Sequence, residues 1–150
     1  MTVIAWDGKT LAADKMNQTG DTISTTTKIK QLPSGEILAI SGISSIGLMM
    51  ISWYESGADK SNFPITTDKD LCATMIVADC NGCKEYHSST GPSPIKIEDK
   101  FAAWAVGREA ALGAMEMGAN AIQAVEIASK WVLGCGRGVD SFEIIGDKNE

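Results

Sequence analysis

The N-terminal pair Met1-Thr2 can supply both a nucleophile and its base. Methionine before a small residue is normally removed after synthesis, which would leave Thr2 with a free α-amine. A threonine hydroxyl attacks poorly until a base takes its proton, and an α-amine with a pKa of roughly 7.7–8.0 can take it at neutral pH. A threonine and its own amine form one variant of the nucleophile–base pair of hydrolases. These residues therefore predict a hydrolytic site at Thr2.

A hairpin would bring a carboxylate to this threonine. Apolar segments over residues 2–6 and 9–15 flank the Asp7-Gly8 pair, which favours a type I′ turn because both turn residues need positive φ. Pairing across the turn would place Thr2 beside Asp14 at one end of a sheet. An ordinary edge hairpin with a surface Asp14 is the competing interpretation, and the hairpin alone favours neither.

Length and composition fit one domain over residues 1–150. At this size folding buries roughly 68–70% of the surface of the extended chain, which is enough for a sizeable core. A net charge of −6 with singly scattered Lys and Arg argues against nucleic acid or an anionic membrane as partner. No basic segment precedes an apolar run, and no apolar run reaches the ~20 residues that span a bilayer. We therefore expect a soluble, cytoplasmic protein.

The cysteines and the single histidine give little support for a metal site. Cys80 and Cys83 have the spacing of a zinc or redox pair, but the Asn-Gly between them is itself a hairpin turn and no second such pair follows. Cys72 lies in an apolar segment and Cys135 among glycines, so we predict ordinary reduced thiols, with one zinc site as the alternative. His87 is the only histidine, which excludes a multi-His site. We expect neither a metal nor a cofactor.

The remaining chain predicts strand hairpins and helices in separate blocks. Apolar or β-branched runs between turn signals predict strands, and amphipathic or Ala-rich stretches predict helices. The expected strands cover residues 25–32, 37–41, 72–79, 84–88, 101–106 and 139–145, and the expected helices run from 44 or 45 to near 57, from 108 to 117 and from 121 to 133. Residues 17–21 and 61–70 are expected to be loops. This order favours an α+β fold in which helices cover antiparallel sheets.

Motifs in two parts of the chain resemble one known family. Asp7-Gly8 followed by Leu11-Ala12-Ala13-Asp14-Lys15 resembles the start of proteasome β-subunits and HslV-type peptidases, which are N-terminal-nucleophile hydrolases. Ala111-Leu112-Gly113-Ala114-Met115, followed by Gly118, resembles the family's third helix, although a small-residue face chosen for close packing would suit many folds. The resemblance covers nearly the whole chain. It implies a four-layer αββα sandwich, with two antiparallel sheets between helix layers.

The resemblance also implies roles for particular residues. Thr2 would be the nucleophile, Lys28 would favour its alkoxide, and Asp14 would hold Lys28 charged and oriented. The N–H of Gly42, in Ser41-Gly42-Ile43, would face the oxyanion of a tetrahedral intermediate. Without the resemblance, Lys28 would be a solvated strand lysine and Gly42 a residue needed for chain reversal. The residues expected around the substrate are Thr26, Lys30 and Ile40.

The site departs from the family pattern in three places. The stretch from Thr2 to Asp14 is a few residues shorter, so only a tight first hairpin lets Thr2 reach the nucleophile's place. Ala105-Val106-Gly107 replaces a Gly-Ser-Gly whose serine supports the terminal amine. Val132 and Cys135 replace the Asp and Ser of a DxxSG motif. The central residues are therefore present while their surroundings are altered.

The preferred prediction is a threonine-type peptidase that acts on peptides or unfolded proteins. The helix expected near residue 50 carries Met49, Met50, Trp53 and Tyr54, which are too many apolar side chains for one core and favour a homo-oligomer. The resemblance implies a ring that could work with an ATPase partner. A catalytically silent structural or regulatory relative and an amidase acting on a small amide are the alternatives.

Overall fold

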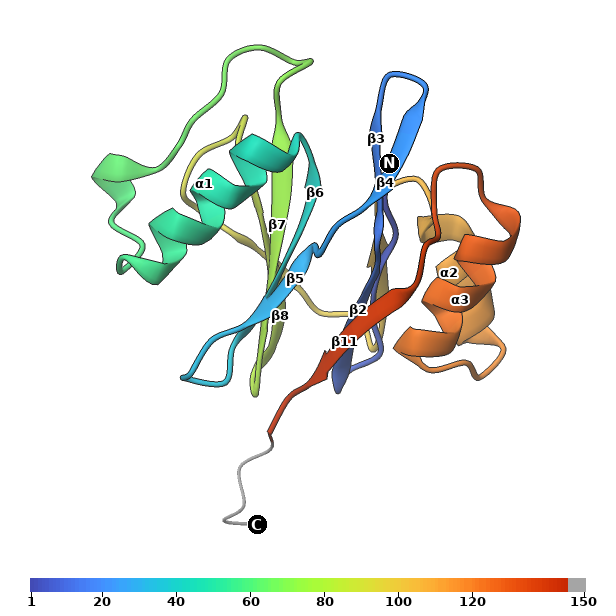
Figure 1. Cartoon of the computed structure of the whole chain (residues 1–150). Helices are drawn as coiled ribbons and strands as arrows, with labels where there is room; N and C mark the ends of the chain where they lie inside the picture. Colours follow the sequence, from blue (N-terminus) through green and yellow to red (C-terminus); the bar gives the residue numbers. More distant parts are fainter. Residues whose placement is uncertain (146–150) are drawn as a thin grey trace.

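The computed structural model describes residues 1–145 and shows two stacked antiparallel sheets between two layers of helices (Figure 1). The first sheet has the strand order β10-β1-β2-β11, and two helices cover its outer face. Its elements are β1 (Ile4–Trp6), β2 (Thr10–Asp14), β10 (Ala102–Trp104), β11 (Val139–Glu143), α2 (Arg108–Glu116) and α3 (Ala121–Trp131). This arrangement confirms the αββα sandwich.

The second sheet has the strand order β5-β6-β7-β8-β9, and α1 (Ser44–Glu55) covers its outer face. Its strands are β5 (Ile29–Gln31), β6 (Ile37–Gly42), β7 (Ala73–Asp79), β8 (Gly82–His87) and β9 (Ile95–Ile97). A separate hairpin, β3 (Met16–Thr19) with β4 (Thr22–Thr25), follows β2, and a short 3-10 helix, η1 (Lys60–Asn62), follows α1. None of the helices in residues 1–145 is long and apolar enough to cross a membrane.

The start of the chain contributes to two separate cores. Ile4 and Trp6 pack between the two sheets, whereas Val3 and Ala5 pack beneath α2 and α3. Successive side chains of a strand point to opposite faces, so a strand covered on both sides is apolar at every position. This double burial fixes the N-terminal segment, and with it the position of Thr2.

The first hairpin differs from the prediction. Its loop has four residues, 7–10, and of these only Gly8 has a positive φ, at +95°. Asp7 Oδ1 accepts two N–H groups of the same loop at 2.8 and 3.0 Å, and its Oδ2 accepts the N–H of Ala121 at the start of α3 at 2.8 Å. The type I′ prediction is wrong because these bonds stabilise a longer loop in which Asp7 keeps a negative φ.

Two other stretches also differ from the prediction. Residues 17–21, expected as a loop, form most of β3 and the turn of the β3–β4 hairpin, which contains Gly20 with φ of +59°. The strand expected over residues 25–32 is divided, because residues 26–28 belong to no strand and cross from the hairpin to β5. The strand β9 is additional. The three predicted helices are confirmed to within two residues at each end.

Candidate active site

A cleft of about 370 Å³ opens beside Thr2. Residues 16–19 and 26–28 line one part of it, residues 40–45 and Leu48 line another, and Met1 completes the lining with Thr2. The first turn of α1 therefore borders the cleft. Among these lining residues, Lys28 is the only charged side chain.

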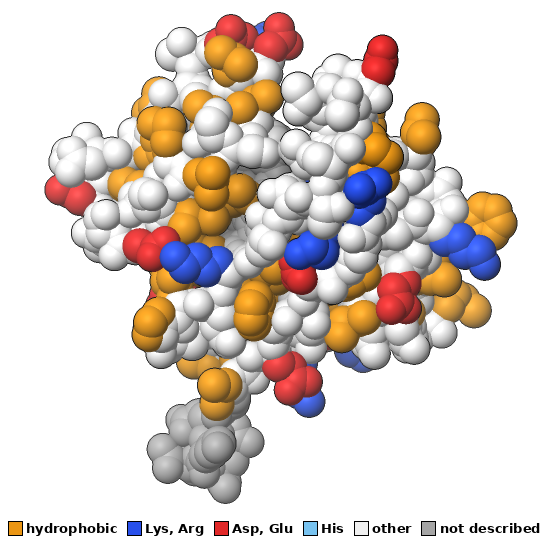
Figure 2. All heavy atoms as spheres, in the orientation of Figure 1, with side chains coloured by type: hydrophobic (Ala, Val, Ile, Leu, Met, Phe, Trp, Pro, Cys, Tyr) orange, Lys and Arg blue, Asp and Glu red, His pale blue; other side chains and the backbone are white. Residues whose placement is uncertain are grey.

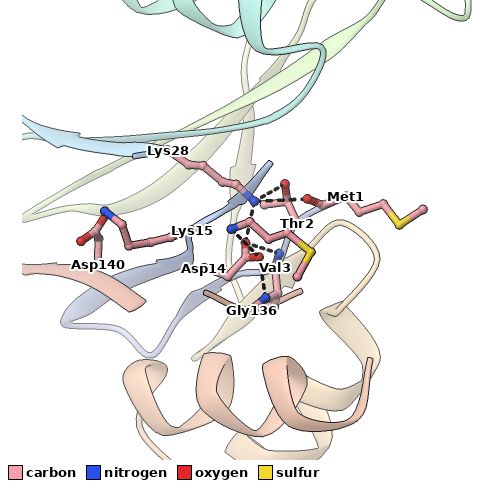
Figure 3. A network of polar contacts seen from close by, with 9 residues as sticks. Met1, Thr2, Val3, Asp14, Lys15, Lys28, Gly136 and Asp140 are labelled. Atoms are coloured by element: carbon pink, nitrogen blue, oxygen red, sulfur yellow. Dashed lines mark hydrogen bonds and ion pairs between the residues drawn. The ribbon is translucent and has the colours of Figure 1, made fainter. Parts of the chain in front are cut away.

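Thr2 and Lys28 line this cleft, and Asp14 lies behind them, in contact with Lys28 (Figure 3). The Nζ of Lys28 donates to Thr2 Oγ1 at 3.0 Å and to Asp14 Oδ1 at 2.7 Å. All three residues are buried, with exposed fractions of 4% for Thr2, 0% for Asp14 and 7% for Lys28. Lys28 is therefore not the solvated lysine of the alternative interpretation. Its ammonium is held between a carboxylate and a hydroxyl.

The carboxylate of Asp14 has four hydrogen-bond donors around it. Besides the ammonium, Oδ1 accepts the N–H of Val3 at 3.1 Å. Oδ2 accepts the N–H of Gly136 at 3.0 Å and the N–H of Met16 at 3.3 Å. A buried carboxylate is tolerated when it is paired and hydrogen bonded in this way. Asp14 can therefore hold the ammonium in a fixed place.

The backbone explains why these three side chains meet. The N–H of Asp14 donates to the carbonyl of Val3 at 3.2 Å, which places the end of β2 beside Thr2. Lys28 ends the irregular segment 26–28, and its carbonyl accepts the N–H of Ile40 on β6 at 3.0 Å. Despite its shortness, the first hairpin brings the Thr2 hydroxyl within hydrogen-bond distance of Lys28.

Gly42 lies in the cleft lining with a φ of +90°. A Cβ at this position would lie 2.5 Å from the carbonyl oxygen of Cys72, so the backbone packing requires glycine without any catalytic role. A contribution of its N–H to an oxyanion hole stays a prediction.

The three predicted substrate contacts are not placed alike. Thr26 and Ile40 line the cleft. Lys30 lies outside the lining, and its ammonium instead pairs with the carboxylate of Glu55 at the end of α1, at 3.0 Å. The structure therefore does not bring Lys30 to the site, because on β5 its side chain points away from the cleft toward an exposed ion pair.

Met1 is attached to Thr2 and lies against the site. Its carbonyl accepts a hydrogen bond from Lys28 Nζ at 3.2 Å. Its side chain lies over Gly134 so closely that a Cβ there would collide with it. While Met1 is present, the nitrogen of Thr2 is an amide and cannot act as a base. This form holds the hydroxyl and the ammonium in place but has no amine.

Residues near position 135 belong to the site, although the sequence indicated only that Cys135 replaces the Ser of the family's DxxSG motif and did not indicate a contact with Asp14. Gly136 donates its N–H to Asp14, as described above. Cys135 is buried beside it, and burial, with a smaller effect of the Asp14 charge, raises the pKa of the Cys135 thiol to about 11. The thiol is therefore neutral near pH 7 and is not a base. Within residues 1–145 no group of three metal-ligating side chains could hold an ion.

Comparison with known proteins gives structural but not sequence matches. No protein-family model and no curated protein matches the sequence. The chain is similar to BPH from Thiobacillus denitrificans in complex with epoxomicin, with a TM-score of 0.73 and 18% identity over 98% of this chain and 100% of that one. A further structure of Thiobacillus denitrificans BPH matches with a TM-score of 0.70 and 20% identity over 97% of this chain and 99% of that one. Eukaryotic HslV from Trypanosoma brucei matches with a TM-score of 0.69 and 16% identity over 95% of this chain and 97% of that one. The resemblance found in the sequence is thus confirmed at the level of the fold: nearly the whole chain adopts the fold of the HslV-type, proteasome-like peptidases.

Proposed function

We propose that this chain is a threonine-type peptidase that uses Thr2 as its nucleophile after removal of Met1. The observation that carries the proposal is the 3.0 Å hydrogen bond from the Lys28 ammonium to the Thr2 hydroxyl, with Asp14 behind the ammonium at 2.7 Å. The fold shared with HslV supports the same reaction class, although a fold by itself does not establish an activity.

In the proposed reaction, loss of Met1 converts the nitrogen of Thr2 from an amide to an amine. The amine takes the Oγ1 proton as Oγ1 attacks the carbonyl carbon of the scissile amide, and Lys28 stabilises the alkoxide character. The N–H of Gly42 is proposed as an oxyanion donor, a role that is typically worth roughly 3–4 kcal/mol. The tetrahedral intermediate then expels the amine of the substrate, which receives the proton from the Thr2 amine. Water then hydrolyses the ester formed on Thr2 Oγ1.

The buried ion pair favours an active enzyme over a catalytically silent relative. Moving Lys28 and Asp14 out of water carries a desolvation cost that an apolar pair of similar volume would avoid. The pair is retained where its ammonium bonds to a hydroxyl at the edge of a cleft. A role at that hydroxyl explains this placement, whereas a purely structural role does not need it.

The shape of the surface favours a peptide over a small amide as substrate. The cleft shares Ser45 and Leu48 with a second groove of about 510 Å³ along α1, so an extended chain could occupy both. The lining is uncharged apart from Lys28, whose charge Asp14 compensates, which favours uncharged substrate side chains. Ile40 would contact such a side chain. A ligand complex, that of BPH with epoxomicin, exists for a protein of the same fold.

The homo-oligomeric ring, the ATPase partner and the cytoplasmic location stay predictions. Two of the α1 side chains offered as evidence for an oligomer, Met50 and Trp53, are buried in the chain's own core. Leu48 and Met49 remain exposed, and Figure 2 shows apolar side chains over α1 beside a hollow in the surface. The apolar surface left for a second copy is therefore smaller than the sequence indicates.

The test compares peptide turnover by the Met1-retaining chain, the Met1-free chain and two variants at Thr2. Because the amide form lacks the general base, its turnover should be lower by roughly 10²–10⁴-fold. Thr2→Ser keeps both hydroxyl and amine and should stay active, whereas Thr2→Ala should be inert. Intact mass should show that an electrophilic peptide modifies only the trimmed chains with a hydroxyl at position 2. Equal turnover by all forms would place the chemistry elsewhere.

A further inference from the structure

Lys15, the residue that follows β2, contacts three other segments of the chain. Its Nζ donates to Asp140 Oδ2 at 2.8 Å and to Thr27 Oγ1 at 3.1 Å, and Figure 3 shows it beside Asp140. Its N–H donates to the carbonyl of Gly136 at 3.0 Å, and its carbonyl accepts the N–H of Thr26 at 2.8 Å. One residue therefore connects β2, the strand β11, the loop before β11 and the segment 26–28.

The segment 26–28 depends on these bonds because it belongs to no strand. It ends at Lys28, whose carbonyl is held by the second sheet. The first two residues of the segment bind Lys15, one through its N–H and one through its hydroxyl. Replacing the Lys15 side chain would keep the backbone bond to Thr26 but remove the bond to Thr27, the residue next to Lys28. The end of the segment that carries the Lys28 ammonium would then be held less firmly.

The loop over residues 134–138 also contacts Lys15, directly through a backbone bond and, two residues after the loop, through the ion pair with Asp140. It supplies the N–H of Gly136 to the carboxylate of Asp14, so its position determines how that carboxylate is capped. Arg137 in this loop has a φ of +67°, a conformation that costs free energy for a residue with a side chain. The loop therefore keeps its shape through outside contacts, of which the backbone bond to Lys15 is one.

We propose that Lys15, together with Asp140, is a positioning residue that sets where Lys28 lies relative to the Thr2 hydroxyl. Lys15 does not line the cleft, so it acts through the other residues and not on the substrate. Its ion pair is partly buried, with side-chain exposures of 24% and 30%, unlike an ordinary surface pair. The effect on kcat rests on the proposed function, whereas the contacts that Lys15 makes do not depend on it.

A second ion pair between the first hairpin and β11 offers a matched control. The ion pair between Lys9 and Glu143 also joins the first hairpin to β11, at 3.3 Å, but its side chains are 70% and 61% exposed and it lies away from the site. Lys15→Met and Asp140→Asn should each lower kcat by roughly 10- to 100-fold with little change in KM, since a small displacement of a reacting group has that effect. Glu143→Gln should leave kcat unchanged. A wild-type kcat in either site variant would overturn the proposal.

The pH profile distinguishes positioning from a simple charge effect. Removing the positive charge of Lys15 and removing the negative charge of Asp140 would move the acidic limb of kcat in opposite directions if charge alone mattered. Displacement of Lys28 moves the limb upward in both variants, because the nearby ammonium then disfavours protonation of the Thr2 amine less. Limb shifts of opposite sign would overturn the proposal.

Amide hydrogen exchange tests the contacts without any turnover. Both site variants keep the acceptors of the Thr26 and Gly136 amides, so exchange at these amides measures how far loss of the side-chain bonds loosens the two segments. It should be roughly tenfold faster in both site variants and at the wild-type rate in Glu143→Gln. Unchanged exchange in the site variants would overturn the proposal even if kcat fell. Faster exchange in a chain whose wild type shows no turnover would support the positioning role and reject the proposed function. Asp140→Asn is nearly isosteric, so it keeps the test valid if Lys15→Met fails to fold.

Discussion

Replacing Lys28 with methionine should destabilise the fold as well as stop hydrolysis. From sequence alone, a lysine on a strand away from the core would cost no more than about 0.5 kcal/mol when substituted. The structure corrects that expectation, because Lys28 is 7% exposed and pairs with a fully buried Asp14. The substitution leaves that carboxylate without its counter-charge.

The size of the effect follows from what remains around Asp14. Removing one partner of a buried ion pair typically costs about 3–5 kcal/mol. Asp14 keeps three backbone N–H donors, and methionine fills most of the volume of the lysine stem, so we expect the low end of this range. A loss of about 3 kcal/mol in a chain of this length corresponds to a fall of about 6–12 °C in Tm.

The assay is equilibrium unfolding in denaturant at pH 7, run beside peptide turnover. Lys30→Met is the matched control, since Lys30 lies two residues away and pairs with Glu55 at 3.0 Å but is half exposed, and it should cost at most about 1 kcal/mol. In the double variant Lys28→Met/Asp14→Asn the losses of unfolding free energy should not be additive, and the coupling free energy should be about 0.5–3 kcal/mol. A Lys28→Met variant that is as stable as Lys30→Met and still turns over peptide would refute the reasoning.

Four further outcomes are expected. Gly42→Ala should cost more than about 1 kcal/mol, because its Cβ would lie 2.5 Å from a carbonyl oxygen at a φ of +90°. Gly35→Ala is the control, since Gly35 has a similar φ but open space around it. Equal losses of unfolding free energy for the two variants in denaturant melts would mean that crowding at Gly42 contributes nothing. Cys80 is exposed and should react with a maleimide at pH 7.5, whereas buried Cys135 should react only after unfolding, as intact mass can show. Folding raises the pKa of the Cys135 thiol from 9.0 to about 11, so the stability that the neutral thiol contributes is complete below about pH 9 and is lost as the pH rises toward 11. Cys135→Ala should therefore reduce the fall in the free energy of unfolding between pH 9 and 11, and an unchanged slope would count against this assignment. Light scattering at micromolar concentration should show an oligomer, and a monomer under several salt conditions would reject the ring.

The parts of the site that the sequence predicts are those set by local pairing. Thr2 and Asp14 are brought together by a single hairpin, so the spacing of its two strands was enough to place them. The exact turn was not needed: the loop at 7–10 differs from the type I′ prediction, yet the strand ends still meet. Only the family resemblance predicts the place of Lys28, since a run of β-branched residues gives no sign that the strand breaks at 26–28.

The contacts that the sequence could not predict join residues more than a hundred positions apart. Gly136 donates to Asp14 across 122 positions, and Lys15 pairs with Asp140 across 125. Both depend on β11 pairing with β2, which apolar periodicity does not specify because any strand of the sheet could take that edge. Neither contact has a local signal, since Gly136 lies in a glycine-rich stretch and Lys15 is predicted only as the end of the first hairpin.

The buried ion pair connects stability and catalysis in one place. Asp14 must be charged to hold Lys28, and its remaining donors come from three separate parts of the chain, at Val3, Met16 and Gly136. Because these donors are backbone N–H groups, a substitution that shifts the backbone at any of these positions can lower both the free energy of unfolding and the turnover. Activity alone will not separate a catalytic residue from a supporting one here. The informative comparison is between variants of equal stability, because only then does a difference in kcat report on the geometry of Lys28 and Thr2.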